Sequence, residues 1–233
     1  MAGKKIKLGA LFSSGKDSTY AIYKMKEAGY DIACLVSLVS ENLYSYMFHT
    51  PAIELAELQA EAMGIPIIIK KTKGEKEKEL KDLSNAIKEA KKKFNIDGII
   101  TGALHSQYQK DRIEKICKAL GIKVHNPLWQ MDQEKEMMEI LEAKFDIIFT
   151  GIAGLGLNHG WLGRKITKRD LNKLIELNKS YGINVAGEGG EFETLVIDCP
   201  LFKKKLVIEE FTIMEENDNT ARMLIQKASL GKK

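Results

Sequence analysis

The chain has 233 residues, of which 44% are hydrophobic, so it can bury one large core or two small ones and is not intrinsically disordered. Its net charge of +4 comes from many charges of both signs, and this pattern gives no reason to expect a nucleic-acid partner. No apolar run is long enough to cross a bilayer, and the N-terminus leads directly into an apolar segment. We therefore expect a cytoplasmic protein with no membrane partner.

The cysteines exclude two further classes. They are odd in number, far apart in the chain, and contain no Cys-x-x-Cys pair: Cys34, Cys117 and Cys199. This usage argues against a disulfide framework or a cysteine metal site and predicts buried thiols.

The first predicted elements are a strand over residues 6–12 and a helix over residues 19–28, joined by small residues. We call Phe12–Ser18 the phosphate loop. A strand, a tight loop and a helix in this order direct the unpaired N–H groups of the first helical turn toward the sheet edge, where they form an anion site. Ser13, Ser14 and Ser18 add hydroxyl groups, and Lys16 adds a positive charge.

The phosphate loop does not match the P-loop of common NTPases. Gly9 and Gly15 are separated by five residues where that motif has four, and Asp17 follows the lysine where the motif has a hydroxyl residue. The loop resembles the Ser-Gly-Gly-x-Asp-Ser loop of the N-type ATP pyrophosphatases, with Ser14 in place of the first glycine. A doubly wound domain that binds another anion is the alternative.

Strands and helices continue to alternate over the first 125 residues. The expected strands cover residues 31–39, 65–69 and 97–104, and the expected helices cover residues 52–63, 75–95 and 111–120. This alternation predicts an α/β fold with a doubly wound parallel sheet. The resemblance of the phosphate loop implies that the sheet is of the HUP type found in N-type ATP pyrophosphatases. We assign residues 1–125 to a nucleotide-binding domain.

Ligands on such sheets bind beyond the carboxyl ends of the strands. The phosphate loop, Asn42–His49 and Gly102–Gln109 follow three of the predicted strands, so we expect them to converge around one cleft. The candidates for nucleotide contact outside the phosphate loop are Met47, Phe48, His49, Gly102, Ala103, Tyr108, Gln109 and Arg112. His49 could instead serve in packing, and Tyr108 with Gln109 could instead cap the helix. Arg112 could instead form a surface ion pair.

The pattern changes after residue 125. We expect helices over residues 133–144 and 167–181, a strand over residues 146–152, and paired extended segments in the last forty residues. Residues 126–233 are therefore assigned to a second, smaller α+β domain, which we expect to carry the substrate-binding residues considered below.

This second domain contains an acidic segment, residues 187–194, in which three carboxylates alternate with glycines. Glu188, Glu191 and Glu193 could be solvated turn residues, or they could bind a cation, a substrate ammonium group, or magnesium carried on a nucleotide. In a strand that begins at Glu191, side-chain alternation puts Glu191 and Glu193 on one face.

Four stretches look like the marks of the diphthine–ammonia ligase family: residues 13–18, 46–49, 102–109 and 187–195. The resemblance covers nearly the whole chain and implies that diphthine on translation elongation factor 2 is amidated with ammonia to diphthamide. It implies an acyl-adenylate intermediate with release of AMP and pyrophosphate, and ATP and Mg²⁺ as cofactors.

The resemblance also implies roles for residues. Lys16, Asp17 and Ser18 would be catalytic, with Asp17 the candidate on the metal side. ATP would contact Phe12, Ser13, Ser14, Gly15, Lys16, Asp17, Ser18, Met47, Phe48, His49, Gly102, Ala103, Tyr108, Gln109 and Arg112. From charge, and not from the resemblance, we infer that Glu188, Glu191 and Glu193 hold the quaternary ammonium group of the substrate, which would also contact Gly189, Gly190 and Thr194.

Two alternatives stay open at this point. The chain could be an adenylating ligase or thiolation enzyme with another acceptor, such as tRNA, or a regulatory module that binds ATP without turnover. The sequence leaves open whether a homodimer forms.

Overall fold

The computed structural model describes residues 5–40, 55–72 and 76–233. The chain divides into two compact units. Residues 14–16, residues 55–63 and Gln130–Lys233 belong to the second unit by their contacts, and the other described residues belong to the first.

The first unit is built on a parallel sheet, as predicted, although the sheet has five strands where four were expected. Its spatial order is β3-β2-β1-β4-β5. The strands are β1 (Lys7–Leu11), β2 (Asp31–Ser40), β3 (Ile67–Thr72), β4 (Gly98–Ile100) and β5 (Lys123–His125). The strand order reverses between β1 and β4, which is the topological switch point where open α/β sheets bind ligands. β5 was not predicted, because a segment of three residues with two polar side chains forms no apolar run.

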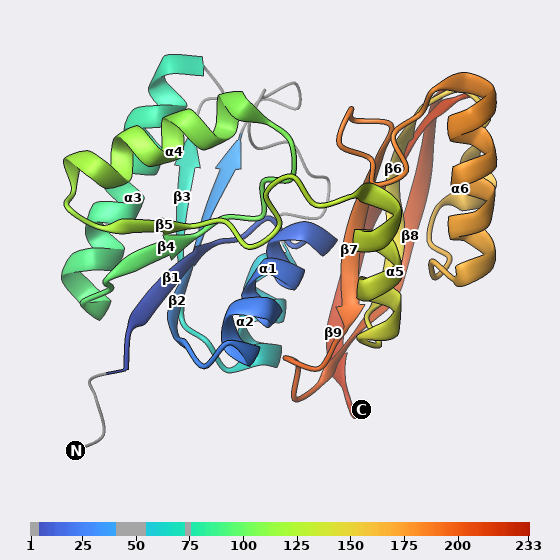
Figure 1. Cartoon of the computed structure of the whole chain (residues 1–233). Coiled ribbons are helices and arrows are strands. Elements are labelled where there is room, and N and C mark those ends of the chain that lie inside the picture. Colours follow the sequence, from blue (N-terminus) through green and yellow to red (C-terminus); the bar gives the residue numbers. More distant parts are fainter. Residues whose placement is uncertain (1–4, 41–54, 73–75) are drawn as a thin grey trace. The chain divides into compact units, whose positions relative to one another are not determined.

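Helices cover both faces of this sheet (Figure 1). α3 (Lys76–Phe94) and α4 (Gln107–Ala119) share one face, since Leu83, Ile87 and Cys117 pack in one buried cluster with residues of β2 and β3. α1 (Lys16–Glu27) lies on the opposite face, as right-handed crossovers require.

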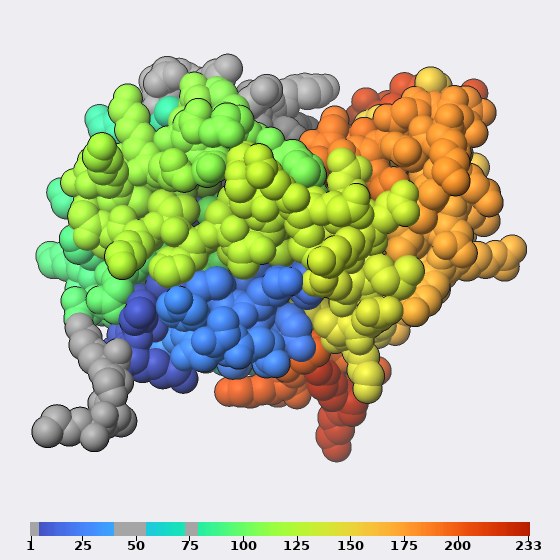
Figure 2. Space-filling view, viewed as in Figure 1, coloured from blue at the N-terminus to red at the C-terminus, as the bar shows by residue number. Residues whose placement is uncertain are grey.

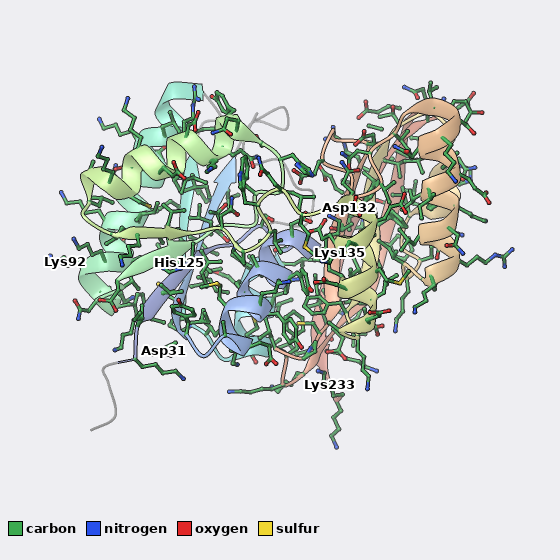
Figure 3. The ribbon with its side chains drawn as sticks, in the orientation of Figure 1. Asp31, Lys92, His125, Asp132, Lys135 and Lys233 are labelled. Carbon is green, nitrogen blue, oxygen red and sulfur yellow. The ribbon has the colours of Figure 1, made fainter. Side chains whose placement is uncertain are left out.

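Polar side chains mark the outer ends of this unit. Lys91, Lys92 and Lys93 are exposed in the last turn of α3, and Lys92 points away from the sheet (Figure 3). His125 ends β5 with its ring edge-on to Tyr30, and burial together with the nearby Lys123 charge lowers the pKa of His125.

Several element boundaries differ from the predicted ones. α1 begins at Lys16 instead of residue 19, and α4 begins at Gln107 instead of residue 111. α4 starts earlier because Ser106 caps it, its hydroxyl accepting from the Gln109 N–H. β4 ends at Ile100, because its pairing with β1 and β5 stops there.

The second unit contains an antiparallel sheet in the order β7-β6-β9-β8, which agrees with the predicted α+β domain. Its strands are β6 (Asp146–Ala153), β7 (Phe192–Asp198), β8 (Lys205–Asn217) and β9 (Thr220–Gly231). Its helices are α2 (Ala56–Met63), α5 (Gln133–Glu142), the short η2 (His159–Trp161) and α6 (Lys168–Tyr181), which forms an outer face in orange in Figure 2. Phe149 anchors the core, with edge-on contacts to Trp161 and Phe192.

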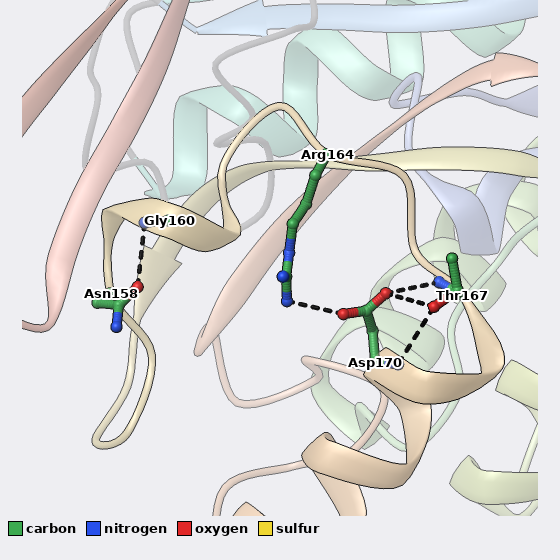
Figure 4. A network of polar contacts seen from close by, with 5 residues as sticks. All are labelled: Asn158, Gly160, Arg164, Thr167 and Asp170. Carbon is green, nitrogen blue, oxygen red and sulfur yellow. Dashed lines mark hydrogen bonds and ion pairs between the residues drawn. The ribbon is translucent and has the colours of Figure 1, made fainter.

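The start of α6 is held by a polar network (Figure 4). Thr167 and Asp170 form a reciprocal capping box, and Arg164 donates to Asp170 at 2.7 Å. This network is accounted for by helix capping alone.

Two predictions concern the whole chain. All three cysteines are buried, as expected, and burial raises the pKa of each thiol to about 12, so none is a ready nucleophile. Among the described residues, no helix has the length and apolar character needed to cross a lipid bilayer.

Candidate active site

The two ends of the phosphate loop belong to the first unit. Phe12 extends the β1–β2 pairing, since its N–H donates to the Val36 carbonyl at 2.9 Å. The Ser18 hydroxyl accepts from the Ser13 N–H at 3.2 Å and lies 3.1 Å from the Ser13 hydroxyl. These contacts hold the start of the loop against the first turn of α1, as an anion-binding turn requires.

The segment after β4 approaches this turn closely. A Cβ added to Gly102 would lie 2.7 Å from the backbone nitrogen of Ser18 and 2.8 Å from the carbonyl carbon of Asp17. Only glycine fits at this position. The predicted convergence of the loops after the first and fourth strands is thereby confirmed. Met47, Phe48 and His49, predicted to join them, lie outside the described residues.

Ala103 is buried directly after Gly102, and its N–H donates to the Thr101 hydroxyl at 3.1 Å. The remaining candidates of the first unit lie in the first two turns of α4. The Arg112 guanidinium stacks over the Tyr108 ring at 3.3 Å from its centroid, and Gln109 takes part in the helix cap. Nucleotide contact by these residues stays a prediction.

The middle of the phosphate loop belongs to the second unit, where it is bonded to β7. The carbonyl oxygen of Ser14 accepts from the Val196 N–H at 3.1 Å, and the Lys16 N–H donates to the Thr194 hydroxyl at 3.2 Å. Ser14 has a φ of +70°, a conformation that residues with a side chain adopt rarely. Its buried hydroxyl has no hydrogen-bond partner among the described residues and is available to a ligand.

The side chain of Lys16 is 1% exposed, and its ammonium lies 3.9 Å from the carboxylate of Glu136 on α5, which is fully buried. A buried ammonium requires a neighbouring negative charge. Glu136 supplies that charge in this structure, and a bound phosphate would supply it at the same atom. No motif in the sequence marks Glu136, which lies in an ordinary amphipathic helix.

The carboxylates of the acidic segment have different surroundings. Both oxygens of Glu191 accept backbone N–H groups of its own loop, from Asn184 at 2.8 Å and from Gly189 at 2.9 Å. Glu191 thus orders the loop that carries Glu188 and Gly190. β7 begins one residue later than the strand start considered above.

Glu193 lies within β7, opposite Gly151 of β6, whose missing side chain leaves room for the carboxylate. Burial raises the pKa of Glu193 to about 7, although Arg222 of β9 works in the other direction. One oxygen of this carboxylate has no hydrogen-bond partner in the described part of the chain. A buried carboxylate of this kind can bind a cation or exchange a proton near neutral pH.

Metal binding by protein side chains alone finds no support in the described residues, which contain no group of three histidine, cysteine or carboxylate side chains that could hold an ion. Asp17, half-buried in the first turn of α1, is the nearest carboxylate in sequence to the loop glycine.

Comparison with known proteins gives matches in both halves of the chain. The family model described as the diphthamide synthase N-terminal domain matches residues 6–124, and the C-terminal domain model matches residues 132–230. The proteins named diphthine–ammonia ligase from Bos taurus and Homo sapiens are each 35% identical to this chain over 228 residues, which is 90% of this chain and 85% of theirs.

A solved structure also resembles the chain. It is described as a predicted subunit of tRNA methyltransferase from Methanocaldococcus jannaschii and is 15% identical, with a TM-score of 0.45 over 84% of this chain and 98% of the other.

Proposed function

We propose that this chain, which belongs to the diphthamide synthase family, is a diphthine–ammonia ligase. The reaction would amidate the carboxylate of diphthine on translation elongation factor 2 with ammonia, in the cytoplasm where that factor acts. The observation that carries the proposal is the coverage of the family match, which includes the phosphate loop and the acidic segment alike.

Two steps would complete the reaction. The diphthine carboxylate attacks the α-phosphorus of ATP, forming a C–O–P linkage and breaking the bond to the β-phosphate, so that pyrophosphate leaves. The nitrogen of ammonia then attacks the acyl carbon, loses a proton, and displaces AMP. Negative charge grows on the leaving pyrophosphate in the first step, and fixed donors and cations that stabilise it would accelerate that step.

The phosphate loop would supply these donors. We assign Lys16 and Ser18 to the phosphates, with Ser13, Ser14 and the backbone of Gly15. The close approach of Gly102 to the first turn of α1 supports the assignment of Ser18. The buried hydroxyl of Ser14, which has no hydrogen-bond partner among the described residues, supports the assignment of Ser14. The adenosine would contact Phe12, Met47, Phe48, His49, Gly102, Ala103, Tyr108, Gln109 and Arg112.

Magnesium would enter with ATP, with Asp17 as the protein residue that orders or binds it. The ion supplies positive charge to the phosphate oxygens when bound. The residues fit such an ion only as a partner of the nucleotide, in agreement with the lack of a three-residue ligand group in the described chain.

The acidic segment would bind the quaternary ammonium group of diphthine. Glu193 is the best supported of its carboxylates, because one of its oxygens is buried without a partner among the described residues. Glu191 already accepts two backbone N–H groups, so its contribution would be to hold Glu188, Gly189, Gly190 and Thr194 in place.

The test uses the full chain with ATP, magnesium, ammonium and elongation factor 2 that carries diphthine. We expect diphthamide, AMP and pyrophosphate in equal amounts, measured by mass spectrometry and nucleotide chromatography. ADP as the product would overturn the proposal. Activity that requires tRNA would favour another adenylating enzyme, and ATP binding without turnover would favour a regulatory module.

A further inference from the structure

Gln59 is a buried amide on α2 that lies in none of the sequence motifs discussed above. Its side-chain nitrogen donates to two backbone carbonyl oxygens, that of Ser14 at 3.1 Å and that of Val196 at 2.7 Å. Both partners are acceptors, so the side-chain amide must present its nitrogen to them. With the amide flipped by about 180°, its oxygen would face two other oxygens and form no hydrogen bond with them. One side chain therefore joins the phosphate loop to β7 through both of its N–H bonds.

Gln59 contacts Ser14, whose backbone conformation is strained. Ser14 has a φ of +70°, and such a conformation in a residue with a side chain persists only where the surroundings hold it. Two donors converge on the Ser14 carbonyl, the Val196 N–H and the Gln59 amide. Together they fix the direction of the peptide group that leads into Gly15 and Lys16.

The helix that carries Gln59 is itself tied to this unit. The carbonyl of Ala62 accepts from the Lys203 N–H at 2.7 Å, and Glu61 pairs with Lys204 at 3.5 Å. The amide thus extends from an anchored helix, which is a requirement for holding a loop in place.

We propose that Gln59 is a positioning residue for the phosphate loop, which acts through the Ser14 carbonyl to hold the backbone of Gly15 and Lys16 in the conformation that binds the triphosphate. This inference rests on the proposed function only in taking ATP as the ligand.

The first experiment replaces the amide by a side chain of similar size in the Gln59→Met variant. We expect the Kd for ATP, measured by calorimetry, to rise about tenfold, the loss typical of one buried hydrogen bond that preorganises a site. The matched control is Asn178→Leu, which removes another side-chain amide that donates to a backbone carbonyl, that of Ile183 at 2.6 Å at the end of α6. This control should bind ATP as the wild type does.

The second experiment separates positioning from simple stabilisation. Glycine adopts a positive φ without steric cost, so Ser14→Gly should remove much of the need for Gln59. The double variant Ser14→Gly with Gln59→Met should bind ATP within about threefold of Ser14→Gly alone, whereas Ser14→Gly with Asn178→Leu should show no coupling. A tenfold loss that persists in the double variant would overturn the proposal.

A third variant serves if Gln59→Met does not fold. Gln59→Glu keeps the shape but presents a carboxylate to two carbonyl oxygens, and protonation restores one donor. Its affinity for ATP should therefore improve as the pH falls from 8 to 5, relative to the wild type. If the ratio of the Kd for ATP of Gln59→Glu to that of the wild type does not change with pH, the positioning role is contradicted.

The outcomes distinguish this inference from the proposed function. A wild-type chain that binds ATP but makes no diphthamide would overturn the proposed ligase activity and would not affect the proposed role of Gln59. Equal ATP affinity in the wild type and Gln59→Met would overturn the role of Gln59 alone. A wild type that does not bind ATP would overturn both.

Discussion

The backbone N–H of Lys16 donates to the side-chain hydroxyl of Thr194 at 3.2 Å, across 178 residues of sequence. One residue belongs to the phosphate loop and the other to the acidic segment, two of the stretches that carry the family resemblance. Both belong to the second unit by their contacts. The hydrogen bond makes the conformation of the phosphate loop depend directly on β7.

Replacing Thr194 by valine tests this dependence. Thr194→Val keeps the shape and removes the acceptor, so the hydrogen bond from the buried Lys16 N–H is lost at a cost of about 1 to 3 kcal/mol in unfolding free energy. We expect a several-fold weaker Kd for ATP, with Thr194→Ser close to the wild type. The measurements are urea unfolding and calorimetry.

Thr150 provides the matched control for that substitution. It is fully buried in β6, and its hydroxyl has no hydrogen-bond partner in the described part of the chain. Thr150→Val should leave ATP binding unchanged and the unfolding free energy equal or higher, because an unpaired polar group is removed. A weaker ATP affinity in this variant as well would show that both effects arise from the core.

Gly102 is expected to tolerate no side chain. Gly102→Ala places a methyl group 2.7 Å from the Ser18 nitrogen and must push the first turn of α1 away, at a cost of about 3 kcal/mol. ATP binding should be lost with this change, as followed by calorimetry on protein that remains folded by circular dichroism. Gly160→Ala is the control, since only the Asn158 side chain lies near, at 3.1 Å; wild-type affinity in Gly102→Ala would contradict the site.

The buried pair of Lys16 and Glu136 allows stability and catalysis to be separated. Lys16→Met should lower the unfolding free energy by about 3 to 5 kcal/mol, since it removes the ammonium 3.9 Å from the buried Glu136 carboxylate. The double variant Lys16→Met with Glu136→Leu should recover most of that loss in unfolding free energy, measured by urea unfolding, because neither position then carries a buried charge. It should still release no AMP; recovered AMP release would exclude a catalytic role for Lys16.

Glu193 should give stability a distinct pH dependence. Its pKa is about 7 in the folded chain against an ordinary value of 4.5, so below pH 4.5 the carboxyl is protonated in both states. Between pH 4.5 and 7 the unfolded chain loses the proton while the folded chain keeps it, and the unfolding free energy falls by up to about 3 kcal/mol.

Glu193→Gln should therefore be more stable than the wild type at pH 8, with the difference vanishing near pH 4.5. Urea unfolding at several pH values measures this. Glu176→Gln, at an exposed position on α6, should show no such trend. If the unfolding free energies of Glu193→Gln and the wild type differ by a constant amount across the pH range, the pKa of Glu193 is not raised in the folded chain.

Several features were predictable from the sequence because they depend on local pattern. The alternation of apolar strands and amphipathic helices predicted the parallel sheet, and a glycine-poor apolar run gave β2 within one residue of its observed end. The loop between β1 and α1 was recognisable because its chemistry, small residues before a helix, lies within seven consecutive positions. Short β5 and the early start of α4 were missed, since tertiary pairing and a cap decide them.

By itself the amino-acid order determined the α/β class, the extended character of the last forty residues, and the positions of the phosphate loop and acidic segment. Only the tertiary structure decided that Glu191 orders its own loop, that Lys16 is buried beside Glu136, and that Gln59 holds Ser14. The reason is physical: periodicity and turn chemistry act over a few residues, whereas the partner of a buried polar group is chosen by whichever distant segments the folded chain brings within 3 to 4 Å of it.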